Sequence, residues 1–485
     1  MNLFDLIMKK NEKQLSNHAV VCNGKCFTYY ELDEYVKSIS ELLKNCGIRK
    51  GCKVALIVSK PLDFIVLFLS MILCDGIIVP IYENTGIKKT LELIEKFHIE
   101  YLITSDTNFI KYSEYEGIME LVVNENGYRV LYTKSTIEYE ELYNVILILL
   151  TSGTTNIPKG VMLTADNITS NIESISKYLN LKPNERVLLI KNLCHASSIV
   201  GEFLVALFNG CCLVLTVQLP LASNILKTIE QEKISIFFAV PTILKQMMEY
   251  KKINDYDFTN LRIINFYGSK MPYQDILKLI QIFKNTNLIY SYGLTEASPR
   301  VTYIEREDLL NKLASSGRPI DNVKVKIFDS DGKEIESYEK GEIIVEGPNV
   351  MLGYYQNDLL TKNTIRNGLL HTGDLGYLDE DGYLYVTGRI DNMIIISGKN
   401  IQPEEIEGVL STFPDILEAL VTENEESQLI AYIVTKDNKK LEIIDVLKYC
   451  KERLEDYKIP KEIIIIEKFE KTVSGKVKRV KYISK

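Results

Sequence analysis

The feature that most constrains the fold is a regular alternation of short apolar runs with segments of helix length. The run Val54–Val58 precedes a helical segment, Leu62–Leu73, and a second apolar run, Gly76–Ile81, follows it. The same order returns between Val187 and Ala239. Strands separated by helix-length segments form parallel sheets through right-handed crossovers. The sequence therefore predicts an α/β protein whose first part contains two doubly wound subdomains.

The same alternation predicts further elements of this part. They are helices at Lys88–Phe97, Ile199–Phe208 and Ser223–Glu232, and strands at Tyr101–Thr104, Val145–Leu150, Val187–Leu189, Cys212–Thr216 and Ile236–Ala239.

The character of the sequence changes after about Val323. The expected strands become short and are separated by Asp-Gly and Gly-Pro turns, which is typical of a compact β unit. After Arg389 a new unit begins with a strand at Met393–Ile396 and a helix at Pro403, where proline and the following acids favour a helix start. We therefore expect a large N-terminal domain at residues 1–390 and a small α+β C-terminal domain at residues 391–485.

Composition narrows the class of protein. A chain of 485 residues with 46% hydrophobic and 25% charged residues is expected to form two or more soluble globular units. A net charge of −8 disfavours a nucleic-acid binder, and the apolar run Phe64–Cys74 is shorter than the roughly 20 residues that span a membrane. The N-terminus lacks the pattern of a secretory signal, and nine cysteines without paired CxxC motifs favour a reducing cytoplasm.

The strongest local motif is the decapeptide TSGTTNIPKG, Thr151–Gly160, which follows an apolar run. Its small residues let backbone N–H groups approach phosphate oxygens, its hydroxyl groups donate hydrogen bonds, and Lys159 adds a positive charge. A Walker A loop is excluded because its lysine is followed by Ser or Thr, whereas Lys159 is followed by Gly160. The pattern predicts a binding site for nucleotide phosphates.

Four further motifs follow in order. They are Ser291-Tyr-Gly-Leu-Thr-Glu296, His371-Thr-Gly-Asp374, Gly388-Arg-Ile-Asp391 and Ser474-Gly-Lys476. Together the five motifs resemble those of the ANL superfamily of adenylate-forming enzymes, which contains acyl- and aryl-CoA synthetases, peptide-synthetase adenylation domains and luciferases. The segments Phe27–Asp33 and Gly51–Val58 also fit the start of these proteins, so the resemblance covers essentially the whole chain. It implies activation of a carboxylic acid by ATP as acyl-AMP, release of pyrophosphate, and acyl transfer to a thiol.

The resemblance also implies a role for each motif residue. Two negative charges about 4 Å apart repel by about 4 kcal/mol at an effective dielectric constant of 20, so cations must gather where a carboxylate attacks an α-phosphate. Lys476 would bridge these groups, Glu296 would bind Mg²⁺, and Thr295 would hydrogen-bond the α-phosphate. Asp374 and Arg389 would hold the ribose. The other residues expected to bind ATP, with Tyr292 stacked on adenine, are Thr151, Ser152, Gly153, Thr154, Thr155, Lys159, Gly268, Ser269, Ser291, Tyr292 and Gly293.

The second half-reaction needs a thiol at the acyl group. By resemblance the small domain rotates about a hinge at Asp391, and Gly398 leaves room for a pantetheine arm. Coenzyme A is the favoured acceptor. The phosphopantetheine of a separate carrier protein is the alternative, which Lys399 keeps open because it is atypical of coenzyme A ligases at this position. A non-catalytic nucleotide-binding protein is a remote alternative.

The acid is constrained by His195, which stands where amino-acid adenylases carry an aspartate for the substrate ammonium group. A histidine does not supply that full negative charge, so an α-amino acid is disfavoured and an acyl or aryl acid is expected. The resemblance assigns further pocket residues, many of them small enough to leave room for a ring or a chain. They are Ser197, Ser198, Ala239, Tyr267, Ser291, Ala297 and Arg300. The sequence does not identify the acid or the oligomeric state.

Overall fold

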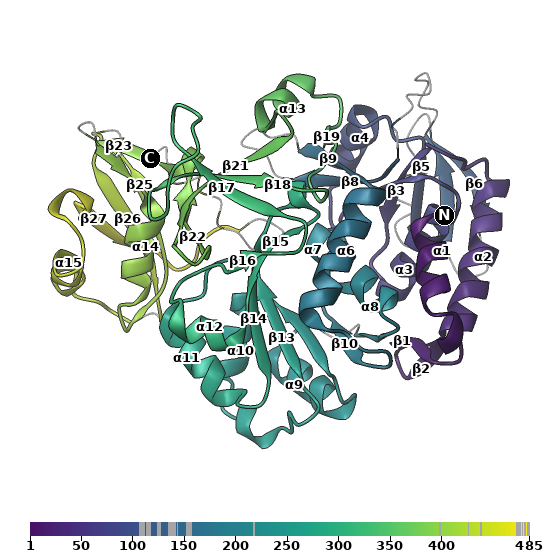
Figure 1. Cartoon of the computed structure of the whole chain (residues 1–485), viewed down its shortest axis with the longest axis horizontal. Coiled ribbons are helices and arrows are strands. Elements are labelled where there is room, and N and C mark those ends of the chain that lie inside the picture. Colours follow the sequence, from purple (N-terminus) through teal and green to yellow (C-terminus); the bar gives the residue numbers. More distant parts are fainter. Residues whose placement is uncertain are drawn as a thin grey trace.

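The structure is a computed structural model that describes residues 1–105, 112, 118–123, 128–133, 142, 144–151, 158–216, 219–396, 399–424, 426–436, 439–471, 477, 479 and 482. Two large sheets, a smaller sheet and a C-terminal unit follow one another across the molecule (Figure 1). This arrangement confirms the predicted α/β class, with a large N-terminal part and a small C-terminal unit.

The first large sheet has the spatial order β19-β9-β8-β4-β3-β5-β7-β6. Strands β8, β4, β3 and β5 are parallel, whereas β9, β19, β7 and β6 run antiparallel to their neighbours. Its strands are β3 (Lys53–Ile57), β4 (Ile77–Pro80), β5 (Tyr101–Ser105), β6 (Met119–Val123), β7 (Tyr128–Tyr132), β8 (Val145–Thr151), β9 (Lys159–Thr164) and β19 (Gly353–Tyr354). The helices of this region are α2 (Tyr29–Asn45), α3 (Pro61–Leu73) and α4 (Ile87–Lys96).

The second large sheet has the order β16-β15-β14-β13-β12-β10-β11-β1-β2. Its strands are β1 (His18–Cys22), β2 (Lys25–Thr28), β10 (Arg186–Leu189), β11 (Cys212–Leu215), β12 (Ile236–Ala239), β13 (Ile263–Tyr267), β14 (Asn287–Gly293), β15 (Arg300–Ile304) and β16 (Arg318–Pro319). The helices of this region are α1 (Leu3–Lys10), α6 (Ala165–Leu179), α9 (Ala222–Gln231), α10 (Pro241–Glu249), α11 (Tyr273–Ile282) and α12 (Arg306–Asn311). The N-terminal hairpin joins this sheet because β1 pairs in parallel with β11, so the subdomains are not successive halves of the chain.

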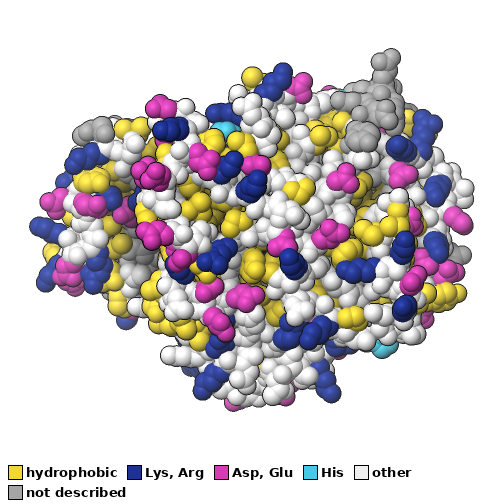
Figure 2. Space-filling model, viewed as in Figure 1, with side chains coloured by type: hydrophobic (Ala, Val, Ile, Leu, Met, Phe, Trp, Pro, Cys, Tyr) yellow, Lys and Arg dark blue, Asp and Glu magenta, His cyan; other side chains and the backbone are white. Residues whose placement is uncertain are grey.

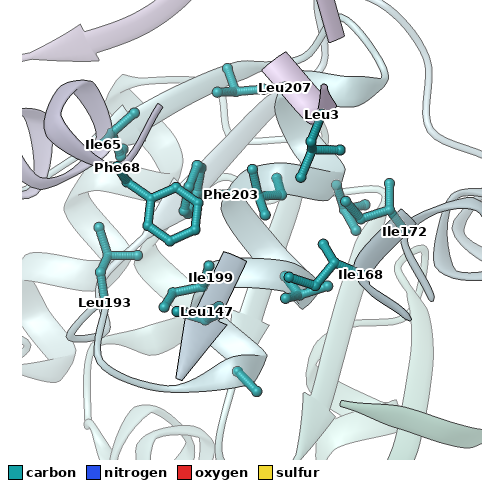
Figure 3. Close-up of a cluster of buried hydrophobic side chains, with 14 of the residues drawn as sticks. Leu3, Ile65, Phe68, Leu147, Ile168, Ile172, Leu193, Ile199, Phe203 and Leu207 are labelled. Carbon is teal, nitrogen blue, oxygen red and sulfur yellow. The ribbon is translucent and has the colours of Figure 1, made fainter. Parts of the chain in front are cut away.

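The helix predicted at Ile199–Phe208 is interrupted. It begins as α7 (Ala196–Ser198), continues as a π-helical segment, η2 (Ile199–Leu204), and ends as α8 (Val205–Phe208). Ile199 and Phe203 of this segment point into the core, where the Phe203 ring meets Phe68 of α3 edge-on at 5.3 Å (Figure 3). This packing fixes the helix that carries several predicted pocket residues.

The smaller sheet and the C-terminal unit confirm the second half of the prediction. The sheet contains β17 (Lys324–Phe328), β18 (Gly341–Glu346), β20 (Ile365–Arg366), β21 (Leu369–Leu378) and β22 (Leu384–Arg389), with α13 (Asp358–Thr364) beside it. The C-terminal unit contains β23 (Ile394–Ile396), β24 (Lys399–Ile401), α14 (Pro403–Ser411), β25 (Ile416–Glu423), β26 (Leu429–Thr435), α15 (Ile443–Lys451) and β27 (Glu462–Ile465). This unit has a hydrophobic cluster of its own, which includes Ile401, Ile406 and Leu410.

The carboxylate of Glu404 lies at the junction of the smaller sheet and the C-terminal unit. Glu404, near the start of α14, accepts a hydrogen bond from Asn392 at 2.6 Å. A Cβ atom added to Gly388 of β22 would lie 2.8 Å from the other oxygen of Glu404. Helix α14 therefore packs closely against β22 at this glycine.

The distribution of charged side chains on the surface agrees with the modest net charge of the chain (Figure 2). Figure 2 shows basic and acidic side chains interspersed over the face in view, without a broad field of one sign. Within the described part of the chain, none of the helices has the length and apolar character needed to cross a membrane.

We expect Phe203→Ala to lower the free energy of unfolding of the large domain by about 3–5 kcal/mol, because it leaves a cavity between α3 and η2. The shift of the urea midpoint measures this effect. Leu359→Ala is the control, since Leu359 is 73% exposed on α13 and its removal should change the free energy by less than about 0.5 kcal/mol. Equal shifts for both variants would contradict the packing described here.

Candidate active site

Three predicted residues lie at the carboxyl edge of the second sheet, with Tyr267 and Ser291 on one face and Ala239 on the other. Ala239 ends β12 and lies in register with Phe266 of β13, and Tyr267 at the end of β13 lies opposite Ser291 of β14. The Ser291 hydroxyl accepts a hydrogen bond from Asn265 at 2.8 Å. Ligands of doubly wound sheets bind beyond this edge. The structure therefore places these predicted residues where such a fold holds its ligand.

Two motif glycines meet different requirements at this edge. Gly268 has φ +99°, a left-handed conformation that other residues adopt only with strain, and lies exposed with Ser269 directly after β13. A Cβ atom added to Gly293 would lie 1.9 Å from the carbonyl oxygen of Pro299. Gly293 therefore permits the close approach of β14 and β15 beside the proposed nucleotide.

The acidic corner, formed by Tyr292, Asp374 and Arg389, joins three motifs that are separate in the sequence. Asp374 and Arg389 lie opposite each other on β21 and β22, and Arg389 Nη1 is 3.0 Å from Asp374 Oδ1. The Tyr292 hydroxyl donates to Asp374 Oδ2 at 2.5 Å, while Asp374 N donates to Thr372 Oγ1 at 3.0 Å. Burial, reinforced by Asp374, raises the pKa of Tyr292 well above its ordinary value, so this hydroxyl remains a donor.

A second polar group surrounds Glu296, which lies with Thr295 in the 3₁₀ turn Thr295–Ala297. The Tyr354 hydroxyl donates to Glu296 Oε1 at 2.9 Å, and burial followed by the Glu296 charge raises the pKa of Tyr354. Lys159 Nζ lies 5.5 Å from the centroid of the Tyr354 ring. Thr151 pairs with Lys159 across β8 and β9, so both described ends of the phosphate motif approach the side of Glu296.

The predicted acyl pocket lies along the helix that follows β10. His195 directly precedes α7, and its ring nitrogen Nε2 forms a hydrogen bond with the Tyr82 hydroxyl. Ser198 of α7 is fully buried, whereas its neighbour Ser197 is partly exposed. Ala297, in the 3₁₀ turn after β14, is also fully buried. Arg300 is 2% exposed, and its guanidinium carbon lies 3.6 Å from the centroid of the Tyr267 ring.

Sequence reasoning missed four polar residues of the site: Tyr82, Lys191, Glu202 and Tyr354. Tyr82 follows β4 and Lys191 follows β10, so each stands just beyond a strand end where functional residues gather. Glu202 is the one acidic residue in the apolar run Ile199–Phe208, and this pattern could have drawn attention to it. Tyr354 contacts Glu296 across 58 residues, a separation that leaves no local pattern.

Several predicted residues are not tested by this geometry. Ser152, Gly153, Thr154, Thr155, Gly398 and Lys476 lie outside the described residues. Asp391 is exposed in the 3₁₀ turn Ile390–Asn392, and its role as a hinge stays a prediction, as does the domain boundary there. On either side of the lysine motif, Lys471 pairs with Glu418 and Arg479 with Glu407.

Comparisons with known proteins agree with this geometry. A sequence model of AMP-binding enzymes matches residues 8–355, and one of the AMP-binding enzyme C-terminal domain matches residues 405–476. The 2-succinylbenzoate–CoA ligase of Bacillus subtilis (strain 168) is 29% identical over 480 residues, or 98% of this chain and 96% of that protein. The feruloyl-CoA synthase of Amycolatopsis sp. is 27% identical over 477 residues, which cover 96% of this chain and 95% of that protein.

A solved structure extends the likeness to three dimensions. The O-succinylbenzoate coenzyme A synthetase of Bacillus subtilis, in complex with ATP and magnesium ion, has a TM-score of 0.86 at 28% identity and covers 98% of each chain. The doubly wound sheets, the acidic corner at Asp374 and the small C-terminal unit define an adenylate-forming fold. The chain belongs to the AMP-binding enzyme family and is an AMP-forming acid–thiol ligase.

We expect Asp374→Asn to raise the KM for ATP at least tenfold, because charge-assisted hydrogen bonds contribute about 1.5–3 kcal/mol each. The rate of acid-dependent pyrophosphate exchange, measured as ATP is varied, gives this constant. Asp331→Asn is the control, since Asp331 is exposed in a turn before β18. An unchanged KM in Asp374→Asn would remove this residue from the ATP site.

Proposed function

We propose that this chain joins a carboxylic acid to coenzyme A through an acyl-AMP intermediate. The acid oxygen attacks the α-phosphate of ATP and releases pyrophosphate. The thiol of coenzyme A then attacks the acyl carbon and releases AMP. The observation that carries the proposal is the meeting of Asp374, Tyr292 and Glu296 with the acyl-pocket residues at one edge of the second sheet.

The residues of the acidic corner are suited to hold the nucleotide. Asp374 is 8% exposed, and its carboxylate is oriented by Arg389 and Tyr292, so it can accept hydrogen bonds from both ribose hydroxyls. The Tyr292 ring is held by the same hydrogen bond and offers a face for the adenine. The orientation is fixed before the nucleotide binds, which lowers the entropic cost of binding.

The residues around Glu296 fit a magnesium site. Magnesium is usually held by one or two carboxylates together with substrate phosphates, and when bound it would supply positive charge to the phosphate oxygens. Glu296 offers one such carboxylate, oriented by Tyr354, whose ring centroid lies 5.5 Å from Lys159 Nζ.

The acid is proposed to carry an aromatic ring, and the acceptor to be coenzyme A. The relatives reported above are named for 2-succinylbenzoate and for feruloyl-CoA, and both names specify coenzyme A. Tyr267 and His195 supply flat side chains around the predicted acyl pocket. All nine cysteines are unpaired, so we assign the reaction to the reducing cytoplasm.

Exchange of labelled pyrophosphate into ATP, driven by a panel of aromatic and aliphatic acids, tests this function. The expected result is exchange with at least one aromatic acid, and formation of its thioester when coenzyme A is added. Parallel reactions with phosphopantetheinylated carrier proteins test the other acceptor. Absence of exchange across the panel would overturn the proposal, whereas thioester formation only on a carrier would overturn the acceptor.

Removing the hydroxyl that orients Glu296 should weaken the response to magnesium. We expect Tyr354→Phe to raise the Mg²⁺ concentration for half-maximal exchange by about tenfold, since a hydrogen bond to a charged group contributes about 1.5–3 kcal/mol. Tyr355→Phe is the matched control, because the Tyr355 hydroxyl contacts His98 instead. If the two variants respond equally to Mg²⁺, Tyr354 does not position the metal ligand.

Lys476 and Gly398 are proposed to serve different half-reactions. Lys476→Ala should abolish formation of acyl-AMP, because it removes the charge between carboxylate and phosphate, yet still convert supplied acyl-AMP to thioester. Gly398→Leu should do the reverse by obstructing the pantetheine arm. Pyrophosphate exchange and single-turnover thioester formation separate the two steps. Equal loss of both steps in Lys476→Ala would contradict the division of roles.

A further inference from the structure

Glu202 is a buried carboxylate that the steps proposed above do not use. It lies on the π-helical segment η2, is fully buried, and is the one acid in the apolar run Ile199–Phe208. The same helix begins with α7, which carries Ser198 and is directly preceded by His195. A buried charge is costly, and a π-helical turn is rare outside functional sites. Their coincidence beside the predicted acyl pocket points to a function for Glu202.

One oxygen atom of Glu202 holds two other side chains. Lys191 Nζ lies 3.1 Å from Glu202 Oε1, and the Tyr267 hydroxyl donates a hydrogen bond to the same oxygen. Lys191 follows β10, and Tyr267 ends β13. The carboxylate therefore joins the helix of the predicted acyl pocket to two strand ends of the second sheet.

The ring of Tyr267 is held by cations as well as by its hydroxyl. Lys191 Nζ and the guanidinium carbon of Arg300 lie 3.7 and 3.6 Å from the centroid of this ring. A cation this close to an aromatic face is attracted by its π electrons. A Cβ atom added to Gly201, the neighbour of Glu202, would lie 3.3 Å from Arg300 Nη2, so the arginine also packs on the helix. These contacts together leave the Tyr267 ring little freedom to turn.

The stability of the fold does not account for this arrangement. The side chain of Glu202 is fully buried and that of Lys191 is 14% exposed. Burial lowers the pKa of Lys191 to about 8, with the charge of Glu202 opposing the shift. Apolar side chains of similar volume in place of a buried ion pair are often neutral or stabilising. What the pair supplies is instead a fixed position for Tyr267.

We propose that Glu202 is a positioning residue for acid binding, because its carboxylate sets the orientation of Tyr267 and Lys191 and with them one wall of the predicted acyl pocket. The inference rests on the proposed function, in which Tyr267 borders the acyl group. In that function the nucleotide is held by other residues, chiefly Asp374 and Tyr292. Loss of the Glu202 contacts therefore weakens binding of the acid and not of ATP.

Pyrophosphate exchange with the full chain, driven by the acid of the panel that gives the highest rate, tests this role. Glu202→Gln should raise the KM for the acid about tenfold, because a neutral amide oxygen accepts hydrogen bonds more weakly than a carboxylate. The KM for ATP and the maximal rate should change less than about twofold, since their contacts lie elsewhere. An unchanged KM for the acid, or an equal rise of both KM values, would overturn the inference and leave the proposed function standing. Exchange with no acid of any class would overturn both.

The chain offers a matched control in a similar group of side chains. The Tyr383 hydroxyl donates to Asp308 Oδ2 at 2.6 Å, at the end of β22 that is distant from Arg389. Lys312 Nζ and the guanidinium carbon of Arg318 lie 4.9 and 4.3 Å from the centroid of the Tyr383 ring. Asp308→Asn weakens a comparable contact and should leave the KM for the acid unchanged. A rise equal to that of Glu202→Gln would show general loosening of the fold and would overturn the inference.

A double-mutant cycle tests whether Glu202 acts through Tyr267. Tyr267→Phe removes only the hydroxyl that Glu202 holds, so the double variant with Glu202→Gln should have a KM for the acid close to that of the weaker-binding single variant. Multiplication of the two single effects would overturn the assigned route. If Glu202→Gln shows no cooperative thermal transition, Lys191→Met combined with Glu202→Met removes both charges and carries the same test. An unchanged KM for the acid in that folded variant would overturn the inference.

Discussion

The shared carboxyl edge of β12, β13 and β14 determines the positions of the site residues. Because these strands are parallel, their ends meet at one edge, where Tyr267 and Ser291 lie side by side on one face and Ala239, level with Phe266, lies on the other. The return of the chain into β15, made possible by Gly293, then brings Arg300 to the same edge. The residues proposed to contact the adenine and the acid thus share one sheet edge, whereas Asp374 and Arg389 belong to the smaller sheet.

Local pattern was sufficient to predict a part of the elements, mainly in the two large sheets and the C-terminal unit. The strand at Ile236–Ala239 and the helix start at Pro403 have the predicted bounds, because a short buried run and a proline in the first turn are local signals. The π-helical segment Ile199–Leu204 was not predicted, since its apolar residues fit an ordinary buried helix equally well. The place of β1 beside β11 was also missed, because strand pairing across the chain has no local signature.

The charged residues of the site could be identified from their motifs, but the residues that form hydrogen bonds to them could not. Asp374 and Arg389 were expected to share the ribose, and the register of β21 and β22 does bring them together. Tyr82 and Tyr354 orient His195 and Glu296 through hydroxyl groups 113 and 58 residues away, and neither contact could be inferred from spacing. The motif residues were recognisable in the sequence, whereas the tyrosines that orient their side chains could be identified only in the folded structure.

The pairing of β1 with β11 has a consequence for the order in which the protein is assembled. Val20 pairs with Leu213, so the partner of the first strand is synthesised about 190 residues after it. At ribosomal rates of 5–20 residues per second, that interval lasts roughly 10–40 s. During this time the unpaired edge of the β1–β2 hairpin is open to other chains, while α2 can already pack on α3. Strand β11 thus completes the edge that β1 leaves open, and until β11 is made that edge has no partner in this sheet.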